Sequence, residues 1–155
     1  MSADRGAVQD LLAEYGALID AAKFDEWLGL FAAECCYQVL PRENYDRGLP
    51  VALIFCHSRA LLEDRIRALR EANKYNIHTD RHIIGLPRIL MHAADGPTVE
   101  APFAVYQTDQ EGETRLFATG IYRDRLERAS GRLTIRDKLI LLDTFAIPSL
   151  LATPL

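Results

Sequence analysis

The fold is decided by residues 58–92, which begin with Ser58-Arg-Ala-Leu-Leu-Glu-Asp-Arg-Ile-Arg-Ala-Leu-Arg-Glu-Ala72. Apolar side chains at Leu62, Ile66 and Leu69 recur at the spacing of one helix face, and the opposite face is charged. This pattern predicts an amphipathic helix packed on a core. Ser58 stands where a side-chain oxygen can cap the first free backbone N–H groups of that helix.

A polar connection follows the helix, and then a strand-like run, Arg81-His-Ile-Ile-Gly-Leu-Pro-Arg-Ile-Leu-Met-His92. Gly85 and Pro87 interrupt this run, and proline cannot donate a hydrogen bond to a strand ladder. We therefore expect a bulge or a sheet edge here. A helix lying on a bent strand is the unit that the rest of the chain completes.

The segments before this unit predict two helices, over residues 7–22 and 24–31, and a short strand over 36–41. The continuous apolar run 51–56 predicts a short buried strand. Between the two strands lies the charged segment 42–50. It is either a solvated turn or a docking loop, because Tyr and Arg are favoured at the centres of interfaces.

The C-terminal half predicts a meander of strands over 98–108, 114–128 and 132–145, separated by turn residues. In the last strand, alternation places Lys138 opposite an apolar row formed by Leu133, Ile135, Leu139 and Leu141. The tail, 146–155, is apolar but has no regular period, so a partner surface or a groove must cover it.

This order of elements predicts an α+β fold in which N-terminal helices pack on one face of a curved, mostly antiparallel sheet. The 155 residues suit a single domain, 1–155. A net charge of −4 disfavours nucleic acid as a partner. We also expect no membrane span and no signal peptide. The three cysteines lack a CxxC spacing, which indicates reduced thiols in a cytoplasmic protein.

The spacing of the metal-binding residue types gives little support for a metal site. His78 and His82 are four residues apart, but they lie at a predicted helix-to-strand junction, where helical geometry does not bring them together. A facial iron site needs two histidines and a carboxylate, and Asp80 and Glu71 are near in sequence only. The sequence lacks the Cys/His spacing that is usual for zinc sites and for Rieske clusters. We expect no cofactor in this chain.

Asp137 is the carboxylate that alternation places among apolar side chains, between Ile135 and Leu139. Loss of water around it would suit a general base. Alternatively, a bulge turns it outward, or it pairs with Arg123 or Arg125, and we favour these structural interpretations. Nucleophile elbows, phosphate-binding glycine loops and dinucleotide fingerprints are absent from the sequence.

Four separated motifs carry a resemblance: Glu43-Asn44 with Arg47-Gly-Leu-Pro50, Asp64-Arg-Ile66 with Leu69-Arg-Glu-Ala-Asn73, Arg81-His-Ile-Ile-Gly85, and Gly120-Ile-Tyr-Arg-Asp124. With them, nearly the whole chain resembles the small (β) subunits of Rieske-type aromatic-ring-hydroxylating dioxygenases. Within that family it is most similar to members acting on aromatic carboxylates, terephthalate first and salicylate next.

The resemblance implies a cone-shaped fold like that of nuclear transport factor 2, within an α3β3 hexamer fed by a reductase component. It implies that the large (α) subunit carries the Rieske [2Fe-2S] cluster, the mononuclear Fe(II) and the substrate pocket. This chain would be a structural subunit, with no catalytic, cofactor-binding or metal-binding residue carried over.

A structural subunit needs surfaces that bind its partners, and three segments are candidates: the 42–50 loop, the 75–82 junction and the tail. The expected interface residues are Glu43, Asn44, Tyr45, Arg47, Tyr75, Arg81, His82 and Leu155. Two other classes stay open. One is a stand-alone cone-fold dehydratase or isomerase that uses a pocket His and Asp, such as His82 with Asp137. The other is a ligand-binding cone without chemistry.

Overall fold

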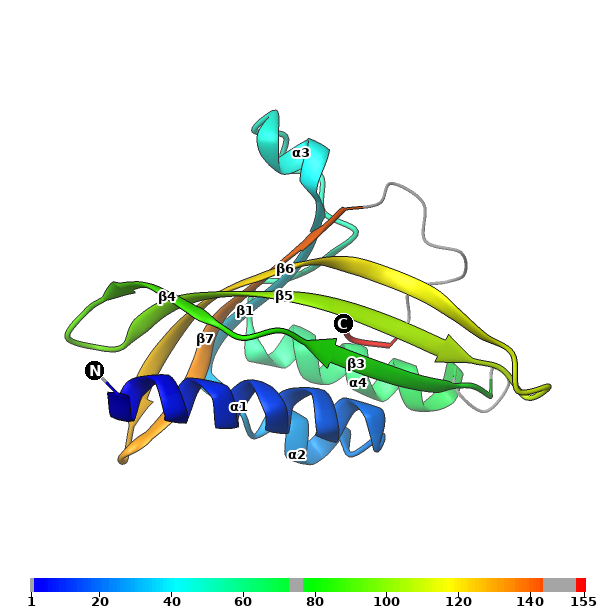
Figure 1. The fold of residues 1–155 in the computed structure, drawn as a ribbon, viewed down its shortest axis with the longest axis horizontal. Helices are drawn as coiled ribbons and strands as arrows, with labels where there is room; N and C mark the ends of the chain where they lie inside the picture. Colours follow the sequence, from blue (N-terminus) through cyan, green and yellow to red (C-terminus); the bar gives the residue numbers. More distant parts are fainter. Residues whose placement is uncertain (1, 73–76, 144–152) are drawn as a thin grey trace.

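The computed structural model describes residues 2–72, 77–143 and 153–155, and Figure 1 shows their arrangement. In chain order the elements are α1 (Ser2–Asp20), α2 (Phe24–Leu28), β1 (Phe31–Pro41), α3 (Arg42–Asp46), β2 (Ile54–Cys56), α4 (Arg59–Ala72), β3 (Thr79–Ile84), β4 (Arg88–His92), β5 (Pro97–Thr108), β6 (Thr114–Ala129) and β7 (Arg132–Leu142).

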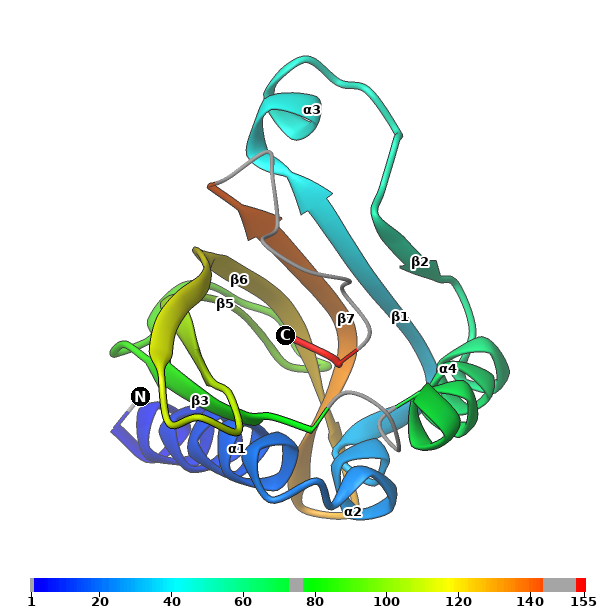
Figure 2. The ribbon, with the colours of Figure 1, turned by 90° about the vertical axis from the view of Figure 1, so that its right-hand side faces the viewer.

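Within these ranges one sheet has the strand order β2-β1-β7-β6-β5-β3, and β4 pairs with β5 on the same edge as β3. Neighbouring strands are antiparallel, except β1 and β7, which are parallel. The sheet curves strongly. The helices α1, α2 and α4 lie along one side of it, whereas α3 projects at the far end (Figures 1 and 2). The predicted α+β arrangement is confirmed.

Helix α4 follows its sequence pattern closely. Leu62, Ile66 and Leu69 are buried in the core, as their spacing predicts. The Ser58 side-chain oxygen accepts a hydrogen bond from the Leu61 backbone N–H at 3.3 Å, which confirms the predicted N-cap. The ion pair between Arg59 and Glu63, at 3.1 Å, lies on the exposed face.

The predicted interruption of the strand after α4 is confirmed: β3 ends at Ile84 and β4 begins at Arg88. The residue that faces this interruption is Pro102 of β5. Pro102 lies where the edge of β5 changes partner from β4 to β3, so its missing N–H is not needed there. The Gly85 N–H donates to the Pro102 carbonyl at 2.8 Å. A Cβ on Gly85 would lie 2.7 Å from the Pro102 ring, so the close approach requires glycine.

Several N-terminal bounds differ from the prediction. The second helix ends at Leu28, and the first long strand already begins at Phe31, where Phe31 and Ala32 are both buried. The 42–50 loop contains the short helix α3. The strand predicted over 51–56 is confirmed only for Ile54–Cys56 (β2), where Ile54 and Cys56 are buried and Phe55 is exposed.

A β-bulge changes the last strand. In the pairing of β6 with β7, Arg125 lies opposite Asp137 and Leu126 lies opposite Ile135, so Arg136 is an extra residue. The expectation that Lys138 faces away from the Ile135 face is therefore wrong. Beyond the bulge the inward positions belong to Lys138, Ile140 and Leu142, each of which is at most 1% exposed.

Candidate functional site

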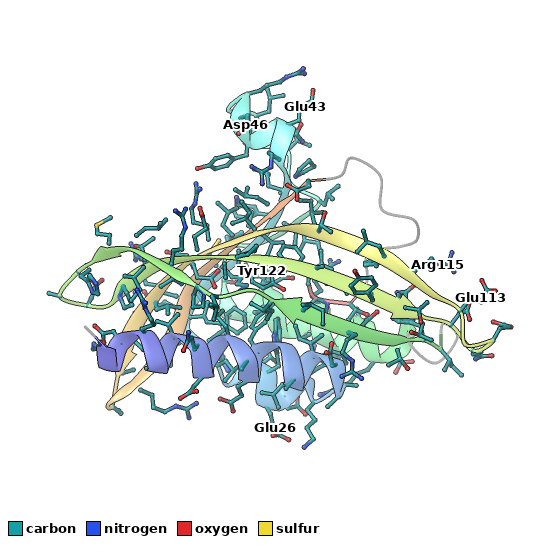
Figure 3. The ribbon with its side chains drawn as sticks, in the orientation of Figure 1. Glu26, Glu43, Asp46, Glu113, Arg115 and Tyr122 are labelled. Atoms are coloured by element: carbon teal, nitrogen blue, oxygen red, sulfur yellow. The ribbon has the colours of Figure 1, made fainter. Side chains whose placement is uncertain are left out.

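The concave side of the sheet encloses a group of aromatic and charged side chains. Tyr15 of α1 lies at its centre. Its ring centroid is 5.6 Å from that of Trp27 and 5.7 Å from that of Tyr122. Tyr122 also stacks on Phe103 at 4.2 Å, and it lies between the sheet and α1 (Figure 3). We call Tyr15, Trp27, Tyr37, Tyr122, Asp124, Lys138 and Leu155 the interior cluster.

An ion pair lies inside this cluster. The Lys138 ammonium contacts the Asp124 carboxylate at 2.9 Å, and both side chains are 0% exposed. The Lys138 nitrogen also lies 3.5 Å from the Tyr122 ring centroid and 4.1 Å from that of Tyr15. Burial raises the pKa of Asp124 and lowers that of Lys138, while the opposite charge of each partner counteracts the shift.

His82 was predicted to lie at a subunit interface, but its side chain is only 1% exposed. Its Nδ1 lies 2.6 Å from the Asp20 carboxylate, which also accepts the His82 backbone N–H at 3.0 Å. The predicted partner Asp137 instead lies on the surface, where Arg125 binds it at 3.1 Å. The pairing of His82 with Asp137 is therefore wrong, and the favoured structural interpretation of Asp137 is confirmed.

Asp20 is not among the residues predicted from the sequence. A sequence signal for it exists in Gly16, one helical turn earlier. A Cβ on Gly16 would lie 3.2 Å from the Ile84 side chain and 3.4 Å from the His82 Cβ, so this glycine lets β3 approach the helix. An otherwise unfavourable glycine in a helix therefore marks the place where α1 and β3 meet.

Leu155 was also predicted to lie at a subunit interface, but the chain covers it itself, with 1% of the residue exposed. The Leu155 N–H donates to the Tyr37 hydroxyl at 3.0 Å, and the Tyr15 hydroxyl donates to the Leu155 carbonyl. Figure 2 shows this end of the described chain on the inner side of the curved sheet. A groove within the same chain, rather than a partner, holds this residue.

The donor side chains do not fit a metal site. Among the residues that the structure describes, no three His, Cys, Asp or Glu side chains form a group that could hold an ion. Burial raises the pKa of the thiols of Cys35, Cys36 and Cys56, so they stay protonated. The described residues therefore contain no ligand set for a Rieske cluster or a facial iron site. Separately, none of the described helices is long and apolar enough to cross a membrane.

Several large apolar side chains are exposed on the outer surface. Residues 42–56, which we call the arm, comprise α3, the following connection and the edge strand β2. Glu43 and Asp46 mark α3 at the end of the molecule in Figure 3. The arm exposes five apolar side chains, which we call the arm patch: Tyr45, Leu49, Val51, Leu53 and Phe55.

Hydrogen bonds hold the arm in place. The Asn44 amide donates to the Val51 carbonyl at 2.9 Å, which closes the connection on itself. Arg42 forms an ion pair with Asp143 of the segment after β7 at 2.8 Å. The Arg123 guanidinium donates to the Tyr45 hydroxyl at 3.0 Å. These contacts tie the arm to itself, to the segment after β7 and to β6.

Of the remaining predicted interface residues, the two arginines are exposed. Arg47 is 67% exposed and pairs with Glu43 at 2.6 Å on the arm. Arg81 is 65% exposed and lies 3.6 Å from Asp20. Tyr75 lies outside the described residues. A second set of exposed apolar side chains lies near the other edge of the sheet: Ile83, Leu86, Leu90 and Met91.

Comparison with known proteins agrees with this architecture. A family model described as a SnoaL-like domain, which has the nuclear-transport-factor-2-like fold, matches residues 1–138. The chain is 36% identical to the β 2 subunit of the terminal oxygenase component of terephthalate 1,2-dioxygenase from Comamonas sp., over 92% of this chain and 93% of the relative. It is 34% identical to the anthranilate 1,2-dioxygenase small subunit from Burkholderia cepacia, over 88% of this chain and 85% of the relative.

A solved structure is similar over almost the whole length. It is described as the β subunit of an aromatic-ring-hydroxylating dioxygenase from Novosphingobium aromaticivorans. It superposes with a TM-score of 0.91 at 38% identity and covers 99% of this chain and 98% of its own. The chain therefore belongs to the SnoaL-like family and, within it, to the small subunits of aromatic-ring-hydroxylating dioxygenases.

Proposed function

We propose that this chain is the structural small subunit of a multicomponent Rieske non-haem iron oxygenase that hydroxylates an aromatic carboxylate such as terephthalate. In this proposal it binds a large subunit in an α3β3 hexamer, in the cytoplasm. The large subunit holds the Rieske [2Fe-2S] cluster and the mononuclear Fe(II), and a reductase component supplies electrons. The named substrates of two relatives, terephthalate and anthranilate, support the substrate class.

The closed interior is the observation that carries the structural role. Tyr15, Tyr122 and Lys138 fill the centre of the cone, and Leu155 is hydrogen-bonded to Tyr15. The His82 side chain is itself only 1% exposed, so a substrate has no open route to it. The described donor side chains also lack the ligand set that an oxygenase iron requires.

The arm supports the assembly role. Exposed apolar patches on soluble proteins mark interaction surfaces, and Tyr45, Val51, Leu53 and Phe55 are all exposed along the arm. Because hydrogen bonds already fix the arm, docking costs little ordering entropy. We infer that the arm binds the large subunit, with Arg47 at its charged rim.

A specific observation also favours a second candidate, a cone-fold dehydratase or isomerase. The Asp20 carboxylate orients His82 in the way a general base is oriented, and His82 Nε2 has no hydrogen-bond partner among the described residues. This candidate needs an open pocket, and the interior cluster occupies that space.

Asp20→Asn separates the two candidates, because asparagine still accepts the His82 backbone N–H but no longer supplies a charge. The variant is co-expressed with the large subunit, and hexamer formation and ring hydroxylation are measured. A structural subunit predicts unchanged turnover per assembled complex. Loss of turnover by at least about tenfold in a correctly assembled complex contradicts the structural role.

A further inference from the structure

The sheet loses its regular pairing on both sides of β7 at a single position, Arg136. On one side, residues 32–35 of β1 lie opposite Arg136 alone, so β1 is strongly bulged there. On the other side, Arg136 is also the extra residue in the pairing of β7 with β6. Bulges redirect side chains and are common beside functional sites.

A cavity of about 350 Å³ lies at this double bulge. It is lined by residues 33–36 of β1, by residues 57–59, which lead into α4, and by Arg136 and Asp137 of β7. These residues are all different from those of the interior cluster, so the cavity is distinct from the inside of the cone. Ala33, Glu34 and His57 are exposed, which places the rim of the cavity at the surface.

The cavity adjoins the arm. His57 directly follows β2, the last part of the arm, and its ring centroid lies 5.7 Å from that of the exposed Phe55. A partner that covers the arm patch therefore also reaches the rim of the cavity. At protein interfaces, the side chains that contribute most to affinity typically fill such pockets, and the contacts around them exclude water.

Two guanidinium groups line the cavity, and other contacts hold both of them in place. Arg59 donates to two backbone carbonyls of β1 at 3.0 and 3.3 Å, and to Glu63 at 3.1 Å. Arg136 donates to Glu127 at 3.1 Å. A guanidinium has five N–H donors, so each group can donate further hydrogen bonds. Such groups suit a carboxylate, which accepts two parallel hydrogen bonds from one arginine.

The cavity also contains two carboxylates, one of which is loosely held. Asp137 is bound by Arg125 at 3.1 Å. Glu34 lies 3.9 Å from Arg136, and its side chain is 87% exposed. A carboxylate that enters the cavity therefore competes with Glu34 for Arg136, while Asp137 keeps its own partner.

We propose that this cavity, which we call the bulge socket, accepts an acidic side chain of the large subunit, and that Arg136 and Arg59 bind its carboxylate. The inference rests on the proposed function, because it requires the arm to dock on that subunit. A free small molecule is a poorer occupant, since the exposed rim leaves much of it in water. A protein partner covers the rim as it docks.

Ala33→Trp tests the bulge socket, because a large side chain at this exposed position fills the cavity and replaces no buried group. We expect association with the large subunit to weaken by at least about tenfold in analytical ultracentrifugation. The matched control is Ala13→Trp, which places the same side chain at an exposed alanine of α1 beside another surface hollow. The control should associate like the parental chain.

Two charge variants test the chemistry of the bulge socket without adding bulk. Glu34→Gln removes the competing carboxylate and should tighten association about threefold, whereas Arg136→Gln removes a donor and should weaken it about tenfold. A basic partner side chain predicts the opposite signs, and an apolar one predicts no response to either variant. Each of these two results overturns the inference.

Phe55→Asp, measured in parallel, separates the bulge socket from the arm. If Phe55→Asp weakens association and Ala33→Trp does not, the inference is wrong and docking through the arm stands. If neither variant weakens association, docking through the arm fails as well. Benzoate titrated into the isolated chain by calorimetry tests the remaining occupant, and saturable binding at micromolar concentration would identify a small-molecule site and overturn the inference.

Discussion

The interior cluster and the arm patch reverse the usual distribution of polarity. Inside, an ammonium, a carboxylate and three phenols are buried, whereas outside Phe55 is 56% exposed among other apolar side chains. The interior groups can persist because they bind one another, as Lys138 binds Asp124 and two aromatic rings. The arm has no such internal cover. The groups suited to chemistry are therefore buried, whereas the apolar groups suited to binding are exposed.

The largest expected effect comes from breaking the interior pair. Lys138→Met leaves the Asp124 carboxylate buried without a partner, so the free energy of unfolding should fall by about 3–5 kcal/mol in urea denaturation. The double variant Asp124→Val with Lys138→Met removes both charges and should recover most of that loss. If Lys138→Met were as stable as the parental chain, the Lys138–Asp124 pair would not be needed to keep Asp124 buried.

A substitution in the arm patch should weaken assembly with the large subunit and leave the stability of the isolated chain nearly unchanged. Phe55→Asp should weaken association with the large subunit by at least about tenfold, because a charge is then buried in the interface. The free energy of unfolding of the isolated chain should change by less than about 0.5 kcal/mol. Analytical ultracentrifugation of the mixed subunits measures the first effect.

Leu116→Asp is the matched control for this variant. Leu116 is 49% exposed and lies near the start of β6. Figure 1 shows this end of β6 at the β5–β6 hairpin, away from α3. Unchanged association of this control assigns the effect of Phe55→Asp to the arm. Equal loss in both variants would show that the arm is not the preferred docking surface.

Arg81→Ala probes the boundary between the two regions, since Arg81 is exposed but lies 3.6 Å from the interior carboxylate of Asp20. Exposed ion pairs contribute little to stability, so the free energy of unfolding should fall by less than about 1 kcal/mol. We expect assembly to weaken a few-fold, and ring hydroxylation to fall only in proportion to the assembled fraction. A lower turnover per complex would contradict this prediction.

The smallest expected effect concerns a rim carboxylate. Hydrogen bonds from Arg123 and Arg88 lower the pKa of Glu100 below its usual 4.5. A lowered pKa in the folded state stabilises the fold above the unfolded pKa, and this contribution is lost as the pH falls through the folded pKa. Between about pH 5 and pH 3 the parental chain should therefore lose more stability than Glu100→Gln. Because both arginines are partly exposed, the difference should stay below about 1 kcal/mol. Parallel acid titrations followed by circular dichroism measure it, and identical curves would contradict the prediction.

Local patterns were sufficient for much of the fold and for the family. The period of α4, its Ser58 cap, the break at Gly85 and the order of helices before meander strands all depend on residues close in sequence. The motifs that carried the family resemblance are equally local. For the same reason the arm was recognisable as a charged segment with Tyr45 and Arg47, although its short helix was not predicted.

The tertiary structure alone decided what lies inside the cone. One extra residue at Arg136 turns Lys138 inward and Asp137 outward, because side chains alternate with a period of two and a bulge shifts every later position. Asp20 meets His82 only when α1 packs on β3, and Leu155 enters the core from 118 residues beyond Tyr37. Sequence periodicity reports which side of its own element a residue faces. Contacts between elements depend on how the sheet curves and where its strands are bulged, and those are properties of the whole fold.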